Sequence, residues 1–248
     1  MDKIYTKKFH VYTYEVDHRG KALPLSLLNY LQDAAGDHAA ILGFSILDLL
    51  STGLTWILSR YHVRIHRYPG LAEDVAVSTW PSAKQGLFAL RDFEMTDAKG
   101  GLVAAATSSW ILWNVRTKQP ARLEENLPDD TTVNRRALAD DFPALPAASA
   151  ADREVSFQVE MQDIDFNNHV NHAVYVRWAL ETAPEAVLRS ARPTDIEVAY
   201  KGEAIYGDEV VSKAQAIGGG PGPVFLHGIH HKARGTELTR LRTVWTFD

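Results

Sequence analysis

Residues 163–181 read DIDFNNHVNHAVYVRWALE, and the organisation of the chain can be worked out from this stretch. Two carboxylates, two carboxamides and an imidazole lie within its first seven residues, and apolar residues then recur at helical spacing. Asn167 or Asn168 is expected to cap a helix from about 170 to 190, because an Asn side chain accepts hydrogen bonds from first-turn amides. The backbone N–H groups of Val170 and Asn171 would then lie at the positive helix end, where an oxyanion is stabilised.

Strands are predicted on both sides of this helix. One runs over residues 153–161, and four more follow at about 194–204, 208–217, 223–232 and 237–247. The first half of the chain reads similarly. It has a strand over 4–16, a helix from Pro24 to Gly43, a short helix or lid over 44–53, and strands over 57–66, 74–82, 86–96 and 102–114.

The two halves align at a constant spacing. Residues 61–65 (YHVRI) match residues 196–200 (IEVAY), and Trp110 matches Trp245, each 135 positions further along the chain. Tyr30 of the first helix matches Tyr175 of the second, so the first half has about ten extra residues, which residues 44–53 supply. An internal repeat of one helix-plus-antiparallel-sheet unit is therefore predicted.

Residues 121–152 differ from both halves, since prolines, acidic runs and Ala/Ser-rich sequence indicate a linker with a short helix around 133–139. The predicted organisation is an N-terminal unit over 1–120, this linker, and a C-terminal unit over 153–248. A long helix with one apolar face, followed by consecutive antiparallel strands, predicts an α+β fold in which each sheet curls around its helix.

Composition excludes several function classes. A net charge of −5 lacks the basic footprint of a nucleic-acid-binding protein. No cysteine is present, so a Cys nucleophile and thiolate metal sites are excluded. No apolar run is long enough for a membrane span, and the N-terminus lacks a signal peptide's apolar core, so a cytoplasmic protein is expected. His227, His230 and His231 do not share one strand face, so no metal is expected.

The loop of residues 163–171, followed by Tyr175, Trp178, Glu181 and Pro184, resembles the active-site segment of the acyl-acyl-carrier-protein (acyl-ACP) thioesterases. The likeness extends into the first half through residues 27–33, 67–69, 79–80 and 108–110. It implies two tandem hot-dog units, in which the N-terminal unit lines the acyl chain and the C-terminal unit carries the catalytic residues.

The resemblance also implies the catalytic residues. Asp165, Asn167 and His169 match the family's Asp-x-Asn-x-His, and Glu203 matches the acidic residue of the following strand. Ala204 stands where plant members have a cysteine, so direct attack by water is favoured. Either Glu203 or His169 would act as the base, Asp165 would orient His169, and Asn167 would join the Val170 and Asn171 amides at the oxyanion.

The function implied is metal-free, cofactor-free hydrolysis of fatty acyl groups held on the phosphopantetheine arm of acyl carrier protein. An acyl-CoA thioesterase, a hot-dog hydratase or dehydratase, and a non-catalytic acyl-binding module are the alternatives, and a homodimer is one open assembly state. Carrier protein is acidic, so a basic patch is expected. The candidates are Arg60, Arg64, Arg67, Arg116, Lys118, Arg122, Arg135 and Arg136.

Overall fold

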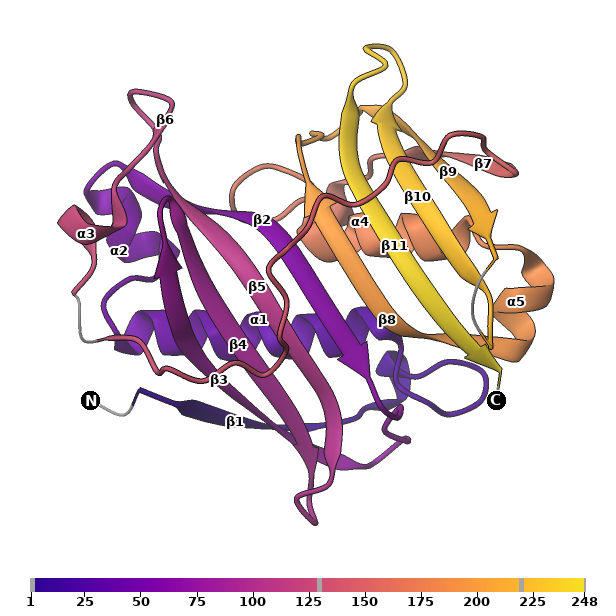
Figure 1. The fold of residues 1–248 in the computed structure, drawn as a ribbon, viewed down its shortest axis with the longest axis horizontal. Coiled ribbons are helices and arrows are strands. Elements are labelled where there is room, and N and C mark those ends of the chain that lie inside the picture. Colours follow the sequence, from indigo (N-terminus) through magenta and orange to yellow (C-terminus); the bar gives the residue numbers. More distant parts are fainter. Residues whose placement is uncertain (1–2, 129–130, 219–220, 248) are drawn as a thin grey trace. The chain divides into compact units, whose positions relative to one another are not determined.

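The structure is a computed structural model that describes residues 3–128, 131–218 and 221–247. The chain divides into two compact units, Met1–Asp141 and Phe142–Asp248. Each unit places a helix against an antiparallel sheet, as the ribbon shows (Figure 1). The predicted α+β architecture is confirmed.

The N-terminal unit holds one sheet in the order β1-β3-β4-β5-β2, with β6 pairing β5. Its strands are β1 (Tyr5–His10), β2 (Leu54–Ile65), β3 (Asp74–Gln85), β4 (Phe88–Asp97), β5 (Leu102–Asn114) and β6 (Gln119–Pro120). Its helices are α1 (Pro24–Ile41), α2 (Ile46–Ser51) and α3 (Leu123–Asn126). The helix predicted from Pro24 and the short helix within 44–53 are both confirmed.

Helix α1 forms because a proline is tolerated at its first position and one continuous apolar face can be buried. Leu27, Leu31 and Ala34 on that face are at most 1% exposed, and the helix packs on β3. Gly43 ends the helical region with a φ of 77°, a left-handed conformation that glycine adopts without strain.

Two local expectations in this unit are wrong. The strand predicted over 4–16 ends at His10, and a short 3-10 turn over Thr13–Glu15 follows, in which the Glu15 carboxylate accepts the Tyr12 N–H at 2.9 Å. The alternating pattern of residues 57–66 predicts that Ile57 and Tyr61 lie on one face of the strand, but the pairing register of β2 shifts between Leu58 and Arg60. Such a bulge reverses the alternation of faces, so Ile57 is 39% exposed although Tyr61 is buried.

The segment predicted to hold a short helix at 133–139 is irregular instead. Several of its polar groups bond to the sheet: the Val133 N–H donates to the Pro81 carbonyl at 2.8 Å, and the Ala137 N–H to the Asp92 carboxylate at 2.8 Å. The Trp80 indole N–H donates to the Arg135 carbonyl at 2.8 Å. These bonds replace the i to i−4 bonds that a helix needs.

The C-terminal unit repeats the same sheet order as β7-β9-β10-β11-β8. Its strands are β7 (Arg153–Gln158), β8 (Ala191–Tyr200), β9 (Glu209–Ile217), β10 (Val224–His231) and β11 (Glu237–Phe247). Its helices are α4 (His172–Glu181) and α5 (Glu185–Ser190), preceded by a 3-10 turn at Met161–Asp163. The single helix predicted over 170–190 is wrong, because Pro184 caps α5 and separates it from α4.

The internal repeat is confirmed, and one side-chain hydrogen bond recurs at matching positions of the two units. The Trp110 indole N–H donates to the Ser108 hydroxyl at 2.8 Å, and the Trp245 indole N–H donates to the Thr243 hydroxyl at 2.9 Å. Within the described ranges, no helix has both the length and the apolar character that crossing a bilayer requires.

Candidate active site

The loop between the 3-10 turn Met161–Asp163 and α4 carries most of the predicted site, and it is a tight turn. The Asn168 N–H donates to the Asp165 carbonyl at 3.0 Å, and the Asp165 N–H donates to the His169 carbonyl at 2.8 Å. Asn168 has a φ of 62°, a left-handed conformation that Asn tolerates better than most residues. The turn presents His169 at the surface, with its side chain 38% exposed.

Asp165 shapes this turn from within. Its carboxylate accepts the Asn167 N–H at 2.8 Å, the pattern of an Asx turn. The expectation that Asp165 orients the His169 ring is wrong here, since no hydrogen bond or ion pair between these two side chains occurs in the described part of the chain. The carboxylate is already engaged by the backbone two residues on.

Glu203 lies beside His169, and the two side chains form the centre of the site. Glu203 Oε1 is 3.4 Å from His169 Nε2, and the Glu203 side chain is 66% exposed. Strand alternation does not place Glu203, because β8 ends at Tyr200. The Lys201 and Gly202 N–H groups both donate to the Leu238 carbonyl, at 2.8 and 3.0 Å, which is a bulge at Gly202 that turns Glu203 out of the strand.

Two hydrogen bonds of Ala204 hold the Glu203 segment against the loop and against α4. The Val170 N–H donates to the Ala204 carbonyl at 2.9 Å, and the Ala204 N–H donates to the Tyr175 hydroxyl at 2.9 Å. Tyr175 is 2% exposed, so its hydroxyl is a fixed anchor inside the unit. Sequence reasoning did not assign Tyr175 a role in the site, although its match to Tyr30 in the repeat marked the position.

Two expectations about the start of α4 are wrong. The N-cap is Asn171, whose side chain accepts the Ala173 N–H at 2.9 Å, and not Asn167 or Asn168. The Asn171 N–H donates to the Asp163 carbonyl at 2.8 Å, and the Val170 N–H is engaged by Ala204. Neither amide is therefore free to bind an oxyanion, because both precede the first helical residue and bond back to neighbouring segments.

Asp163 is a second residue that sequence reasoning left unassigned. It is 2% exposed, its carbonyl accepts the Asn171 N–H, and its carboxylate accepts from Arg177 Nη2 at 2.7 Å. A buried carboxylate needs such a partner, so the Arg177 pair fixes the carbonyl that positions the helix start. The acidic residue before the loop thus supports the site from inside.

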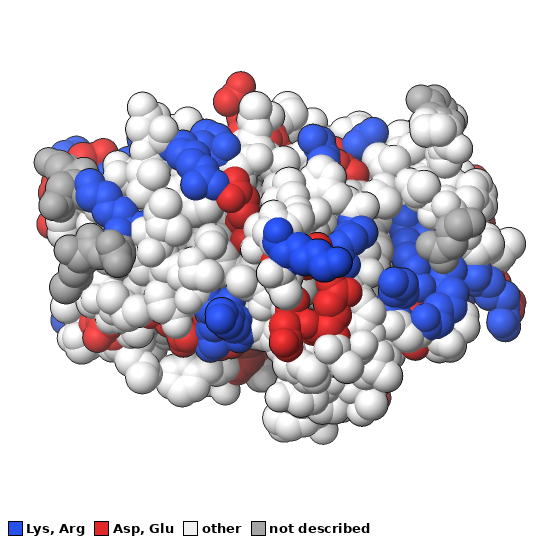
Figure 2. All heavy atoms as spheres, turned by 90° about the horizontal axis from the view of Figure 1, so that it is seen from below, with Lys and Arg blue, Asp and Glu red and all other residues white. Residues whose placement is uncertain are grey.

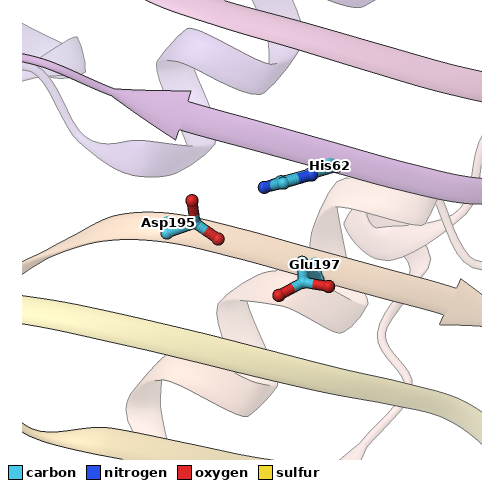
Figure 3. Close-up of side chains that lie close together, drawn as sticks. All are labelled: His62, Asp195 and Glu197. Atoms are coloured by element: carbon cyan, nitrogen blue, oxygen red, sulfur yellow. The ribbon is translucent and has the colours of Figure 1, made fainter. Parts of the chain in front are cut away.

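Neighbouring ionisable groups are occupied elsewhere or kept neutral. Burial lowers the pKa of His172 to about 4, so this imidazole is uncharged near pH 7. On β8, which Figure 3 shows with the side chains of Asp195 and Glu197, Glu197 accepts from Arg242 Nη1 at 2.8 Å. Glu197 is thus a strand carboxylate held in an ion pair, whereas Glu203 is a loop carboxylate held beside His169.

Two family models match the chain. The acyl-ACP thioesterase N-terminal domain matches residues 2–130, and the acyl-ACP thioesterase C-terminal domain matches residues 147–247. The chain belongs to the acyl-ACP thioesterase family. It is a thioester hydrolase with the double hot-dog fold, and both expectations drawn from the resemblance are confirmed.

Curated relatives align along nearly the whole chain. The oleoyl-acyl carrier protein thioesterase 1 of Arabidopsis thaliana, a chloroplastic protein, is 27% identical, over 97% of this chain and 75% of its own length. The chloroplastic dodecanoyl-[acyl-carrier-protein] hydrolase of Cinnamomum camphora is also 27% identical, over 98% of this chain and 67% of its own.

Two solved structures are similar throughout. An acyl-ACP thioesterase of Bacteroides thetaiotaomicron superposes with a TM-score of 0.88 at 26% identity, covering 99% of this chain and 98% of that chain. The 12:0-ACP thioesterase of Umbellularia californica also gives 0.88, at 28% identity, covering 99% and 94%.

Proposed function

We propose that this protein hydrolyses fatty acyl thioesters of acyl carrier protein to free fatty acid and holo-carrier protein, by metal-free attack of water. The observation that carries the proposal is the pairing of His169 Nε2 with Glu203 Oε1 at 3.4 Å on an accessible surface. A carboxylate and an imidazole at this separation can bind one water molecule and share its proton. The family match supports the thioester as the substrate.

In the proposed reaction Glu203 takes a proton from water as the water oxygen bonds to the thioester carbonyl carbon. The tetrahedral intermediate then collapses, the carbon–sulfur bond breaks, and the thiolate takes a proton from His169. Glu203 can return its proton to His169, since the two side chains are adjacent. No covalent intermediate on sulfur arises, because the chain has no cysteine and Ala204 follows Glu203.

The Asn167 side chain is the proposed oxyanion donor. Its carboxamide has no hydrogen-bond partner among the described residues, and the Asp165 bond to the Asn167 N–H fixes its backbone. A single oxyanion donor contributes ~3 kcal/mol to a transition state. Asp165 therefore acts by placing Asn167, and we assign it no contact with the substrate.

Of the eight basic residues proposed to receive the carrier, five already have an interaction partner within the protein. Arg67 pairs with Glu73 and Asp97, Arg122 with Glu125, Arg135 with Glu94 and Arg136 with Asp92. Arg64 also has an interaction partner. The remaining candidates, with no ion pair inside the described ranges, are Arg60, Arg116 and Lys118. Figure 2 shows one face on which Lys and Arg clusters alternate with acidic ones, so any docking patch there is local.

The remaining parts of the proposal come from the resemblance. The N-terminal unit, predicted over 1–120, is proposed to hold the acyl chain, and the C-terminal unit, predicted over 153–248, to carry the chemistry. A cytoplasmic location and a homodimer stay predictions. The assembly state is read from the mass of the eluting species in size-exclusion chromatography with light scattering.

The test is thiol release from acyl-ACP and acyl-CoA substrates of matched chain length. Glu203→Gln and His169→Ala are each expected to lower kcat roughly a hundredfold or more, the scale of losing a general base. Glu185→Gln is the matched control, because Glu185 is similarly exposed and pairs with Arg189 on its own helix, α5. It should keep wild-type kcat.

Three outcomes separate the alternatives. Activity that prefers acyl-ACP supports the proposal as stated. Activity on acyl-CoA alone would agree with the proposed mechanism but reject acyl carrier protein as the carrier. Undiminished hydrolysis by both site variants would reject the His169–Glu203 pair as the catalytic centre.

A further inference from the structure

Arg91 of β4 is a cation in the interior of the N-terminal unit that the proposed chemistry does not use. It lies on the same side of β4 as Phe93 and Met95, which are at most 1% exposed. Arg91 Nη1 donates to His38 Nδ1 of α1 at 3.1 Å and to the Thr79 hydroxyl of β3 at 3.2 Å. The guanidinium therefore lies between the helix and the sheet.

No carboxylate of the described residues pairs with Arg91. Asp92, its neighbour in sequence, points to the opposite side of β4 and pairs with Arg136 at 3.0 Å. Asp37 on α1 pairs with Lys7 at 2.7 Å and accepts from the Tyr5 hydroxyl at 3.1 Å. Asp92 and Asp37 are thus engaged elsewhere, and the charge of Arg91 has no counter-ion among the described residues of the unit.

The two groups that Arg91 contacts do not neutralise it. An arginine can only donate, so His38 Nδ1 is the acceptor and the imidazole carries its proton on Nε2. Thr79 donates its own proton to the Asp92 carbonyl at 3.0 Å and so offers its oxygen to Arg91. Burial lowers the pKa of Arg91 to about 10, which still leaves it charged near pH 7.

Part of the guanidinium has no protein partner. An arginine carries five N–H donors, and both hydrogen bonds of Arg91 come from Nη1. Nε and Nη2 have no acceptor in the described part of the chain, yet Arg91 keeps some accessible surface. An interior cation with unused donors is costly, and folds keep such a group where something else supplies the oxygen.

We propose that Arg91, positioned by His38 and Thr79, is a binding site for an acyl chain whose far end carries an acceptor oxygen, as a carboxylate or a hydroxyl. The inference rests on the proposed function, because it takes the acyl group of the thioester to lie under α1. A carboxylate would supply the missing counter-charge through a bidentate pair, and a hydroxyl would accept one charge-assisted hydrogen bond. A plain methyl end would leave the donors unpaired.

The experiment compares kcat/KM for carrier-bound acyl chains ending in methyl, hydroxyl or carboxylate, over a series of lengths. Wild type is expected to favour an oxygen-bearing end by roughly tenfold or more at its best length, since a site built to hydrogen-bond a group discriminates against its absence. Arg91→Met should abolish that ratio while plain chains are hydrolysed at least as well. Arg135→Met, which removes a cation paired with Glu94 elsewhere in the unit, should keep the ratio.

Hydrolysis of methyl-ended chains tests the proposed function. The ratio of kcat/KM for oxygen-bearing chains to kcat/KM for methyl-ended chains tests this inference. Equal or better hydrolysis of methyl-ended chains at every length would overturn the inference and leave the hydrolase intact. The inference would also be overturned if Arg91→Met kept both the wild-type ratio and the wild-type melting temperature. If no thioester is cleaved, thermal shift with an ω-hydroxy fatty acid against the plain acid decides, because stabilisation should depend on Arg91.

Discussion

The Tyr175 hydroxyl connects the core of the C-terminal unit to Glu203, the proposed catalytic carboxylate. It accepts the Ala204 N–H, and the Ala204 carbonyl accepts the Val170 N–H, so the residue that follows Glu203 is fixed through both of its backbone polar groups. Burial raises the pKa of Tyr175, which stays a neutral phenol under working conditions. Tyr175 is a positioning residue in this arrangement.

Tyr175→Phe is expected to lower kcat about tenfold and to leave KM within about twofold, because a misplaced base affects chemistry more than binding. The repeat provides the control. Tyr30→Phe removes a hydroxyl that donates to Glu15 at 2.6 Å at the matching helix position. Steady-state kinetics and melting temperatures of both variants are compared. Equal losses of kcat would show that Tyr175 acts only through stability.

Among the elements, α4 depends on its cap more than α1 does. Helix α1 starts at Pro24 without a side-chain cap, whereas α4 is capped by the Asn171 carboxamide. Asn171→Ala is expected to lower the free energy of unfolding by about 1 kcal/mol, the cost of losing an N-cap. Urea denaturation measures this change.

Asn171→Ser is the conservative control, since a hydroxyl caps nearly as well as a carboxamide. It should recover most of the lost free energy of unfolding. If alanine and serine are equally destabilising, the backbone bonds around Asp163 determine the helix start and the cap does not.

For the whole molecule, acid stability depends on buried imidazoles. Burial lowers the pKa of His227 to about 3, from an ordinary value of about 6.5. The unfolded chain binds a proton between these values that the folded chain does not bind. The free energy of unfolding therefore falls as the pH drops from about 6.5 toward 3.

His227→Gln is expected to flatten this acid dependence, measured as urea midpoints at pH 7 and pH 5. His172 contributes in the same direction, so part of the slope should remain. His10→Gln is the control, because His10 lies at the surface beside Asp74. A slope unchanged by His227→Gln would contradict the assignment.

Charge also acts over the whole molecule, since the chain has a net charge of −5 and its proposed carrier is acidic. Arg116→Glu combined with Lys118→Glu is expected to raise KM for acyl-ACP about tenfold and leave kcat unchanged, with the effect shrinking in high salt. Acyl-CoA kinetics should change less. Lys99→Glu, in the turn between β4 and β5, is the control. If Lys99→Glu raised KM for acyl-ACP equally, the cause would be general charge repulsion and not the loss of a docking patch.

Much of the fold was predictable because apolar periodicity is a local property. The helix beginning at Pro24, the strands and the repeat marked by Trp110 and Trp245 all follow from spacing. The failures are local as well. A bulge in β2 reversed the face of Ile57, and residues 133–139 bonded to a sheet that no local pattern reveals.

The sequence by itself determined the architecture, the family and the candidate residues Asp165, Asn167, His169 and Glu203, because residue type and order carry them. Only the tertiary structure decided which donors and acceptors remain free. The Val170 and Asn171 amides and the Asp165 carboxylate look available in sequence but are engaged, and Tyr175 anchors the site from the core. The physical reason is that hydrogen-bond partners are set in three dimensions, where most buried polar groups are paired, often with groups far away in the sequence.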